Sequence, residues 1–301
     1  MYDPIPFRRF RGFGVSSEWS GKRRIVGAGL KMYLGYGETI EWLGSLREHI
    51  QELDNVGVFV LPSFLALAAA RDLLGQTPIL YGSQNAHWEV KGPYTGEVSP
   101  AALRELGCTL VEIGHAERRV MFGETDRWVN LKVAEVLRQG MIPLICIGEH
   151  ERQSVQRTID EMRHQVRTAL DSAKHDQECG VREDLSDAII VAYEPIWAIG
   201  AETSAPSEHI FPIIAAIRSE LSCLWPGSNA ILYGGSVDSD DAAGIFETGI
   251  DGLFVGRSAL DLEEFTTIVK VVASNGRAEH GGSPETANSG PEVGRPPQDV
   301  A

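Results

Sequence analysis

The stretch with the clearest chemical potential spans residues 191–200, where an apolar run ends in Glu194 and passes into an apolar loop. Pro195 follows the carboxylate at once, so the sequence predicts a buried strand that delivers a base to a loop. Proton abstraction beside a carbonyl needs a carboxylate in a dry site, and residues 195–200, here called the lid, could exclude water once closed. A Glu-Pro pair alone is more often a simple strand end.

Two further side chains with catalytic potential follow apolar runs elsewhere in the chain. Lys31 comes after residues 25–30, and His115 comes after residues 110–113. A lysine supplies fixed positive charge where an oxyanion develops, and a neutral imidazole can donate a hydrogen bond to the same oxygen. A lysine at such a position is usually only solvated, and a lone histidine is more often structural, so the interpretation depends on their joint occurrence.

Eight apolar runs alternate with segments of helical spacing. Continuous apolarity indicates parallel strands buried on both faces, and the repeated βα pattern predicts a single-domain α/β fold, a (β/α)₈ barrel over residues 24–273. A doubly wound open sheet is the alternative, but Gly27-Ala28-Gly29 lacks the third glycine of its usual fingerprint. The expected strands are 25–30, 56–61, 79–82, 110–113, 141–147, 188–193, 230–233 and 252–255, and the clearest helices are 40–53, 128–139, 154–173 and 208–221.

The loops after the last two expected strands carry glycines suited to an anion. Gly234-Gly235-Ser236 follows one strand, and Gly256-Arg257-Ser258 follows the other. Glycines let the backbone approach an anion, and the start of a short helix offers N–H groups and a favourable dipole. We expect a phosphate here, because active sites of such barrels gather at the C-terminal ends of the strands. A Gly-Gly-Ser run is also a common turn.

Composition describes an ordinary soluble protein with an acidic balance. The 301 residues are 43% hydrophobic and include 27 Lys plus Arg against 42 Asp plus Glu, a formal net charge of -15. This balance argues against nonspecific nucleic-acid binding, so any anionic ligand must be held locally. The four cysteines lack CxxC spacing, which indicates neither a disulfide framework nor a zinc site and favours a reducing cytoplasm. The sequence carries no metal, nucleotide or cofactor motif.

The two ends of the chain differ from the expected barrel. Residues 1–23 contain arginines but no apolar core like that of a signal peptide, so we expect a loose leader. Residues 274–301 are rich in Gly, Pro, Ser, Asn and Glu, which predicts a disordered tail. The most apolar run, residues 56–70, contains Pro62 and is shorter than the roughly 20 residues of a membrane span, so we expect no membrane segment.

Several motifs lie at or near the expected strand ends: Lys31-Met32, Ile113-Gly114-His115, Glu117-Arg118-Arg119, and residues 122–126, 146–149, 192–200, 232–237 and 251–256. Together they resemble the triosephosphate isomerase family over nearly the whole barrel. The resemblance implies a TIM barrel that needs no cofactor or metal. In it Glu194 would shuttle a proton between two carbons of a small sugar phosphate, His115 would polarise the carbonyl, and Lys31 would steady the enediolate. The same resemblance gives substrate or phosphate contacts to Gly29, Lys31, Gly200, Gly235, Ser236, Gly256 and Arg257, and supporting roles to Glu117 and Ile199.

Departures from the family pattern cluster around the expected substrate. Gly29-Leu30-Lys31 stands where the family usually has Asn-Trp-Lys, Ala116 replaces a serine, and Arg257 replaces a glycine. Residues 201–205 replace a Gly-Lys-rich hinge. We hypothesise that the lost amide opens space near the carbon chain and that Arg257 adds an anion contact. The substrate could then be one carbon longer.

Three functions are compatible with this pattern. The first interpretation is a triose-phosphate isomerase of glyceraldehyde 3-phosphate and dihydroxyacetone phosphate, because the general motifs carry that name. The alternative is an isomerase of a four-carbon erythrulose phosphate, because the departures resemble those of family members that act on such substrates. A barrel that binds a sugar phosphate without catalysis would explain the lost amide, but it would not require Lys31, His115 and Glu194 together.

One more loop concerns assembly. Gly92-Pro93-Tyr94-Thr95-Gly96-Glu97 follows the third expected strand and resembles the family's interdigitating dimer loop. The resemblance implies a homodimer in which Thr95 reaches into the site of the neighbouring subunit. An ordinary Pro-Gly surface turn is the alternative.

Overall fold

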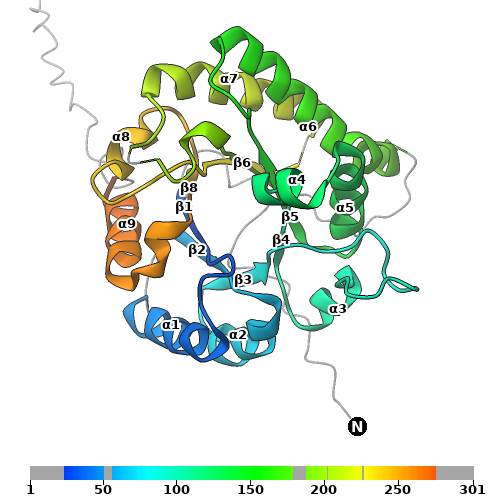
Figure 1. Cartoon of the computed structure of the whole chain (residues 1–301), viewed down its shortest axis with the longest axis vertical. Coiled ribbons are helices and arrows are strands. Elements are labelled where there is room, and N and C mark those ends of the chain that lie inside the picture. Colours follow the sequence, from blue (N-terminus) through cyan, green and yellow to red (C-terminus); the bar gives the residue numbers. More distant parts are fainter. Residues whose placement is uncertain (1–23, 51–55, 179–187, 202, 226, 276–301) are drawn as a thin grey trace, which may run out of the picture.

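The protein is described by a computed structural model, which covers residues 24–50, 56–178, 188–201, 203–225 and 227–275. Eight parallel strands form a closed barrel in chain order, β8 pairing with β1, and helices surround it (Figure 1). This confirms the predicted (β/α)₈ barrel and excludes the open sheet, because an open sheet would leave two unpaired edges. The leader expected at 1–23 lies outside the described residues, and so does the tail expected at 274–301 except for its first two residues, which belong to the last helix rather than to a tail. The strands are β1 (Arg24–Gly29), β2 (Val56–Leu61), β3 (Leu80–Ser83), β4 (Leu110–Ile113), β5 (Ile142–Ile147), β6 (Ile189–Tyr193), β7 (Asn229–Tyr233) and β8 (Gly252–Val255).

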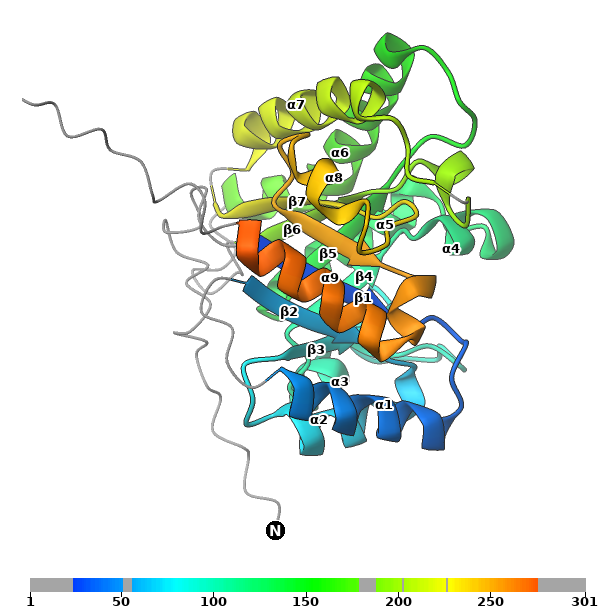
Figure 2. The same cartoon turned by 90° about the vertical axis from the view of Figure 1, so that its left-hand side faces the viewer.

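Helices follow the strands and lie against the outside of the barrel (Figure 2). The first helix begins at Tyr36 rather than at residue 40, because the Glu38 side chain accepts a hydrogen bond from the Gly35 N–H and caps the helix there. The α-helices are α1 (Tyr36–His49), α2 (Leu67–Leu74), α3 (Pro100–Glu105), α4 (Ala116–Phe122), α5 (Asp126–Arg138), α6 (Val155–Glu178), α7 (Ser207–Leu224), α8 (Ala242–Phe246) and α9 (Leu262–Asn275); the 3₁₀ turns are η2 (Phe64–Ala66), η3 (Ile196–Ala198) and η4 (Arg257–Leu260).

The side chains of the strands belong to two apolar cores, one inside the barrel and one between the barrel and the helices. On β5, Leu144 and Cys146 face the barrel interior, whereas Ile145 and Ile147 pack outward against the helices. Both faces are buried, and this is why the strands are continuous apolar runs in the sequence. Inside the barrel, Phe254 stacks on an aromatic ring of β2 with a centroid distance of 5.8 Å.

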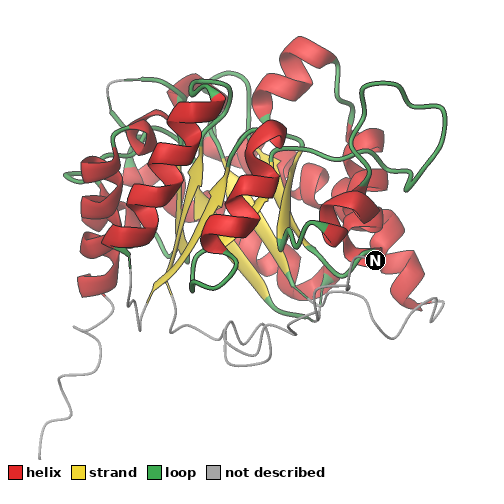
Figure 3. Cartoon of the chain, turned by 90° about the horizontal axis from the view of Figure 1, so that it is seen from below, coloured by secondary structure: helices red, strands yellow, loops and turns green. Residues whose placement is uncertain are grey.

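The connections that follow the strands gather at one end of the barrel, the upper end in Figure 3. All eight strands are parallel, so their C-terminal ends share this end. Side chains that lie far apart in the sequence therefore meet there. Among the described residues, no helix is both long and apolar enough to cross a membrane.

Candidate active site

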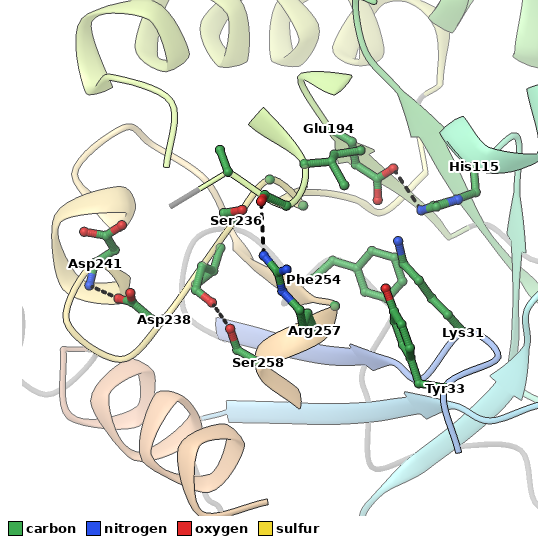
Figure 4. Close-up of a pocket in the computed structure, with 18 of the residues that line it drawn as sticks. Lys31, Tyr33, His115, Glu194, Ser236, Asp238, Asp241, Phe254, Arg257 and Ser258 are labelled. Carbon is green, nitrogen blue, oxygen red and sulfur yellow. Dashed lines mark hydrogen bonds and ion pairs between the residues drawn. The ribbon is translucent and has the colours of Figure 1, made fainter. Parts of the chain in front are cut away.

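A cavity of about 290 Å³ lies at the C-terminal end of the barrel. Glu194 and His115 face each other across one side of it, Lys31 and Tyr33 stand on another, and Ser236 and Arg257 lie toward the loops after β7 and β8 (Figure 4). The structure brings together ten of the residues that the sequence predicted for the site: Gly29, Lys31, His115, Glu194, Ile199, Gly200, Gly235, Ser236, Gly256 and Arg257.

Glu194 follows the last residue of β6, and its backbone N–H donates to the Ile147 carbonyl at 2.8 Å. The side chain is buried; its Oε2 has no hydrogen-bond partner within the described residues and lies 3.6 Å from His115 Nε2. Burial raises the pKa of Glu194, although the positive charge of Lys31 opposes this effect. A carboxylate of raised pKa with an oxygen free for substrate has the properties of a general base.

The residue opposite Glu194 must be small. A Cβ atom at Gly234 would lie 2.7 Å from Cγ of Glu194, closer than real contacts allow. Gly234, which follows β7, therefore leaves room for the base. The sequence analysis placed Gly234 in the expected phosphate loop but not beside Glu194, since a close approach between the ends of two strands cannot be read from composition.

His115 caps the N-terminus of α4. Its Nδ1 accepts a hydrogen bond from the Glu117 N–H at 3.2 Å. A neutral ring that accepts at Nδ1 carries its hydrogen on Nε2, the atom that points toward Glu194 and the cavity. The histidine is thus arranged as a neutral donor to a substrate oxygen.

Lys31 stands two residues after the end of β1 with φ of 49°, the one positive φ among the described non-glycine residues. Gln84 donates to the Lys31 carbonyl at 2.9 Å and holds this uncommon backbone conformation. The Nζ donates to Glu117 at 2.7 Å. Burial lowers the pKa of Lys31, but Glu117 and the nearby Glu194 outweigh that effect, so the net shift is upward and the lysine stays charged.

The loops expected to bind phosphate are joined to the lid. Ser236 Oγ donates to the Ala198 carbonyl at 3.0 Å, and Arg257 Nη2 donates to the Gly200 carbonyl at 3.1 Å. Both side chains also line the cavity. An anion bound there would touch the same two loops that hold the lid.

A hydrogen bond to a buried carboxylate also holds the lid. Trp197 Nε1 donates to the buried carboxylate of Glu149 at 2.7 Å, and Tyr193 and His209 contact the same carboxylate. Ile199 of the lid lines the cavity. The lid thus places the apolar side chain of Ile199 against the cavity, and the exclusion of water by this loop stays a prediction.

The space beside Gly29 differs from our expectation. A Cβ atom at Gly29 would lie 3.0 Å from the Phe254 ring, so the aromatic side chain occupies the region that a larger residue would need. The loss of an amide at this position therefore replaces a polar wall with an apolar one and does not simply open the cavity. Phe254 was not predicted as a site residue, because it looks like any other buried strand residue in the sequence.

Glu117 and Thr95 do not line the cavity. Glu117 contacts both Lys31 and His115. Its Oε1 accepts the hydrogen bond from Lys31 Nζ, and its Oε2 lies 3.6 Å from His115 Nδ1. Thr95 lies on the exposed loop after β3, away from the cavity of its own chain. Glu112, a buried cavity residue of β4, was also missed. Its signal was a charged residue inside a four-residue apolar run.

Comparison with known proteins decides the family. A sequence profile described as triosephosphate isomerase matches residues 24–272. The chain belongs to the triosephosphate isomerase family. Over 256 residues, 83% of this chain and 96% of the relative, it is 38% identical to the L-erythrulose-1-phosphate isomerase of Pectobacterium atrosepticum. Over 254 residues, 82% of this chain and 99% of the relative, it is 36% identical to the triosephosphate isomerase of a Thermoanaerobacter species.

A solved structure supports the same assignment within the triosephosphate isomerase family. The triosephosphate isomerase of Bartonella henselae matches with a TM-score of 0.69 and 30% sequence identity. The match covers 83% of this chain and 98% of that protein. The chain is therefore similar in sequence to a family member named L-erythrulose-1-phosphate isomerase and to one named triosephosphate isomerase, and in structure to a triosephosphate isomerase.

Proposed function

We propose that this protein moves a carbonyl group along a small phosphorylated sugar by proton transfer through an enediolate. The observation that carries the proposal is the convergence of Glu194, His115 and Lys31 on one cavity. Glu194 is the base that takes a proton from carbon, His115 donates to the developing oxyanion through Nε2, and Lys31 stabilises the negative charge. A barrel that only binds a sugar phosphate would not need a buried base with a free oxygen.

We further propose a four-carbon erythrulose phosphate as the preferred substrate and keep triose phosphate as the second candidate. The sequence analysis placed them in the opposite order. The change rests on Glu112, a buried carboxylate that lines the cavity and can hydrogen bond an additional hydroxyl group. Arg257 lines the same cavity and adds a cation near the phosphate that both candidates carry. Triose phosphate remains supported by the proposed catalytic groups, which could serve both substrates. It is also supported by the relative named triosephosphate isomerase, whose sequence identity to this chain is similar to that of the relative named L-erythrulose-1-phosphate isomerase.

The reaction is the same for both substrates. In L-erythrulose 1-phosphate the carbonyl is at C2, beside the phosphate-bearing carbon. Glu194 removes the proton on C3 and returns it to C2, while the hydroxyl proton on O3 moves to O2. The carbonyl then stands at C3, and no oxidant, reductant or cofactor is consumed. Compared with the triose, the substrate carries an extra hydroxymethyl group on the side of the reacting carbons away from the phosphate.

We also propose that the protein acts as a homodimer in a reducing cytoplasm. The loop 92–97 reaches beyond the ring of helices (Figure 1). Large apolar side chains are exposed in the segments that follow β1, β2 and β4, at the same end of the barrel. Met32, Leu65 and Met121 are 93%, 80% and 70% exposed. Apolar surface of this kind is typical of an interface, and a partner would bring its Thr95 toward the site. The free thiols of Cys108 and Cys146 favour the reducing compartment.

The proposed reaction can be tested by following L-erythrulose 1-phosphate in D₂O by NMR. The wild-type protein should move the carbonyl and incorporate deuterium at the carbon that accepts the proton. Glu194→Gln should lower turnover by about 10²–10⁴-fold with little change in binding of the phosphate ester. Turnover of glyceraldehyde 3-phosphate alone would favour the triose candidate. If neither substrate is turned over, the remaining candidate is a barrel that binds a sugar phosphate without catalysis.

A further inference from the structure

Within the described barrel, the inner face carries a carboxylate besides that of Glu194. Glu112 lies on β4 two residues after Leu110, which belongs to the apolar interior, so Glu112 points to the same side. Its neighbours across the strand pairs are apolar, as with Leu144 on β5. A charged residue in this apolar layer lines the cavity that contains Glu194.

Glu112 is poorly paired for a buried carboxylate. It is 7% exposed, and within the described chain its hydrogen-bond partner is the Cys146 thiol, with the donor Sγ 3.8 Å from Oε1. A thiol is a weak donor. Burying a carboxylate without a strong partner costs free energy, and burial accordingly raises the pKa of Glu112 to about 7. A barrel selected only for stability would place an apolar side chain here.

The position of Glu112 relative to the reacting groups indicates its ligand. Cys146 Sγ and one oxygen each of Glu112 and Glu194 lie within 4.8 Å of one another. In the closed ring of eight strands, β4 stands opposite β8, whose following loop carries Gly256 and Arg257. A substrate whose phosphate sits at those residues and whose reacting carbons lie beside Glu194 directs its far end toward Glu112.

We propose that Glu112 is a specificity-determining residue that hydrogen bonds the terminal hydroxyl of the four-carbon substrate. This inference rests on the proposed function. The extra hydroxymethyl group of the tetrulose is the one part of it that the triose lacks, and it lies at the end away from the phosphate. A carboxylate accepts the hydroxyl hydrogen, and a carboxylic acid donates to the hydroxyl oxygen, so either form of Glu112 gains a partner.

The test compares L-erythrulose 1-phosphate with glyceraldehyde 3-phosphate as substrates of the full-length protein. Glu112→Leu should lower kcat/KM for the four-carbon substrate by about 30-fold or more, because a hydroxyl would face an apolar side chain. For the triose, kcat/KM should change less than about 3-fold. Glu112→Gln keeps the shape and can still hydrogen bond, so it should recover much of the loss. Glu135→Gln, which changes a buried carboxylate on α5 far from the cavity, is the matched control.

The outcomes separate this inference from the proposed function. A wild-type protein with no four-carbon turnover overturns the inference together with the proposed four-carbon substrate, and a protein that turns over neither substrate overturns the proposed isomerase function as well. A wild-type protein that prefers the four-carbon substrate, with Glu112→Leu and Glu112→Gln lowering kcat/KM for both substrates equally, overturns the inference alone. That result would assign Glu112 to the support of Glu194. If Glu112→Leu fails to fold, Glu112→Ala decides, because alanine also lacks a hydrogen-bonding side chain: a selective loss on the four-carbon substrate supports the inference, and an unchanged substrate ratio contradicts it.

Discussion

Arg257 donates a hydrogen bond to the carbonyl oxygen of Gly200, 3.1 Å away, and so joins the loop after β8 to the end of the lid. Both residues line the cavity. A phosphate drawn to Arg257 would therefore sit where the lid is held. We therefore expect this one side chain to link substrate binding to closure of the lid.

Arg257→Ala should weaken this link. The hydrogen bond is at an exposed rim, so solvent reduces its value to about 1 kcal/mol, and we expect KM for the sugar phosphate to rise about 5-fold. Steady-state kinetics and competitive inhibition by inorganic phosphate measure the change. Arg71→Ala, which removes an arginine from an exposed pair on α2, should leave both constants unchanged. Equal constants for wild type and Arg257→Ala would show that the lid closes without this contact.

Gly234→Ala should displace the catalytic base. The new Cβ atom would lie 2.7 Å from Glu194 Cγ, so the carboxylate must move by a fraction of an ångström or more. Misplacement on this scale can cost about 10²-fold in kcat. Gly244→Ala on α8 is the matched control, because a Cβ atom there meets nothing within 4 Å. A fully active Gly234→Ala enzyme would contradict the assignment of Glu194 as a tightly placed base.

Glu112 should make stability depend on pH in a defined direction. Its pKa is about 7 in the folded protein against an ordinary value of 4.5, so the folded state binds the proton more tightly. The stabilising effect is complete below pH 4.5 and is lost as pH rises through 7. From this shift the free energy of unfolding of wild type, relative to Glu112→Gln, should fall by about 3 kcal/mol between about pH 4.5 and about pH 8. Denaturant titrations of both proteins measure it, and a constant difference across this range would refute the shift.

Thr95→Arg should disrupt the proposed dimer. Analytical ultracentrifugation should give about twice the chain mass of 32.9 kDa for wild type and a single chain for the variant. We expect kcat/KM to fall about 10-fold or more, because the site would lose the residue supplied by the partner. Thr267→Arg, on an exposed position of α9, should remain a dimer. A monomeric wild-type protein of full activity would rule out this assembly.

Much of the fold could be predicted because the barrel imposes a regular pattern on the sequence. β2, β4 and β8 match the expected residues without change, since buried parallel strands are apolar on both faces. The proposed catalytic groups could also be found from the sequence, because each directly follows a strand or lies within two residues of its end. Residues just beyond the strands of a closed parallel barrel all lie at the same end of it.

The contacts between strands could not be predicted in the same way. Phe254 is far from Gly29 in the sequence, and only the closed barrel brings the aromatic ring of one against the backbone of the other. The place of Glu112 beside Cys146 and Glu194 depends equally on the register of three neighbouring strands. These two features bear most directly on substrate length, which explains why the sequence left that question open.

The central claim is that the cavity selects a four-carbon sugar phosphate. The most direct measurement is the ratio of kcat/KM for L-erythrulose 1-phosphate to kcat/KM for glyceraldehyde 3-phosphate, with Glu194→Gln as the blank. We expect a ratio of about 100 or more, which corresponds to roughly 3 kcal/mol of discrimination in the transition state. A ratio below one would contradict the account and identify a triose-phosphate isomerase whose altered wall at Gly29 and Phe254 leaves its substrate unchanged.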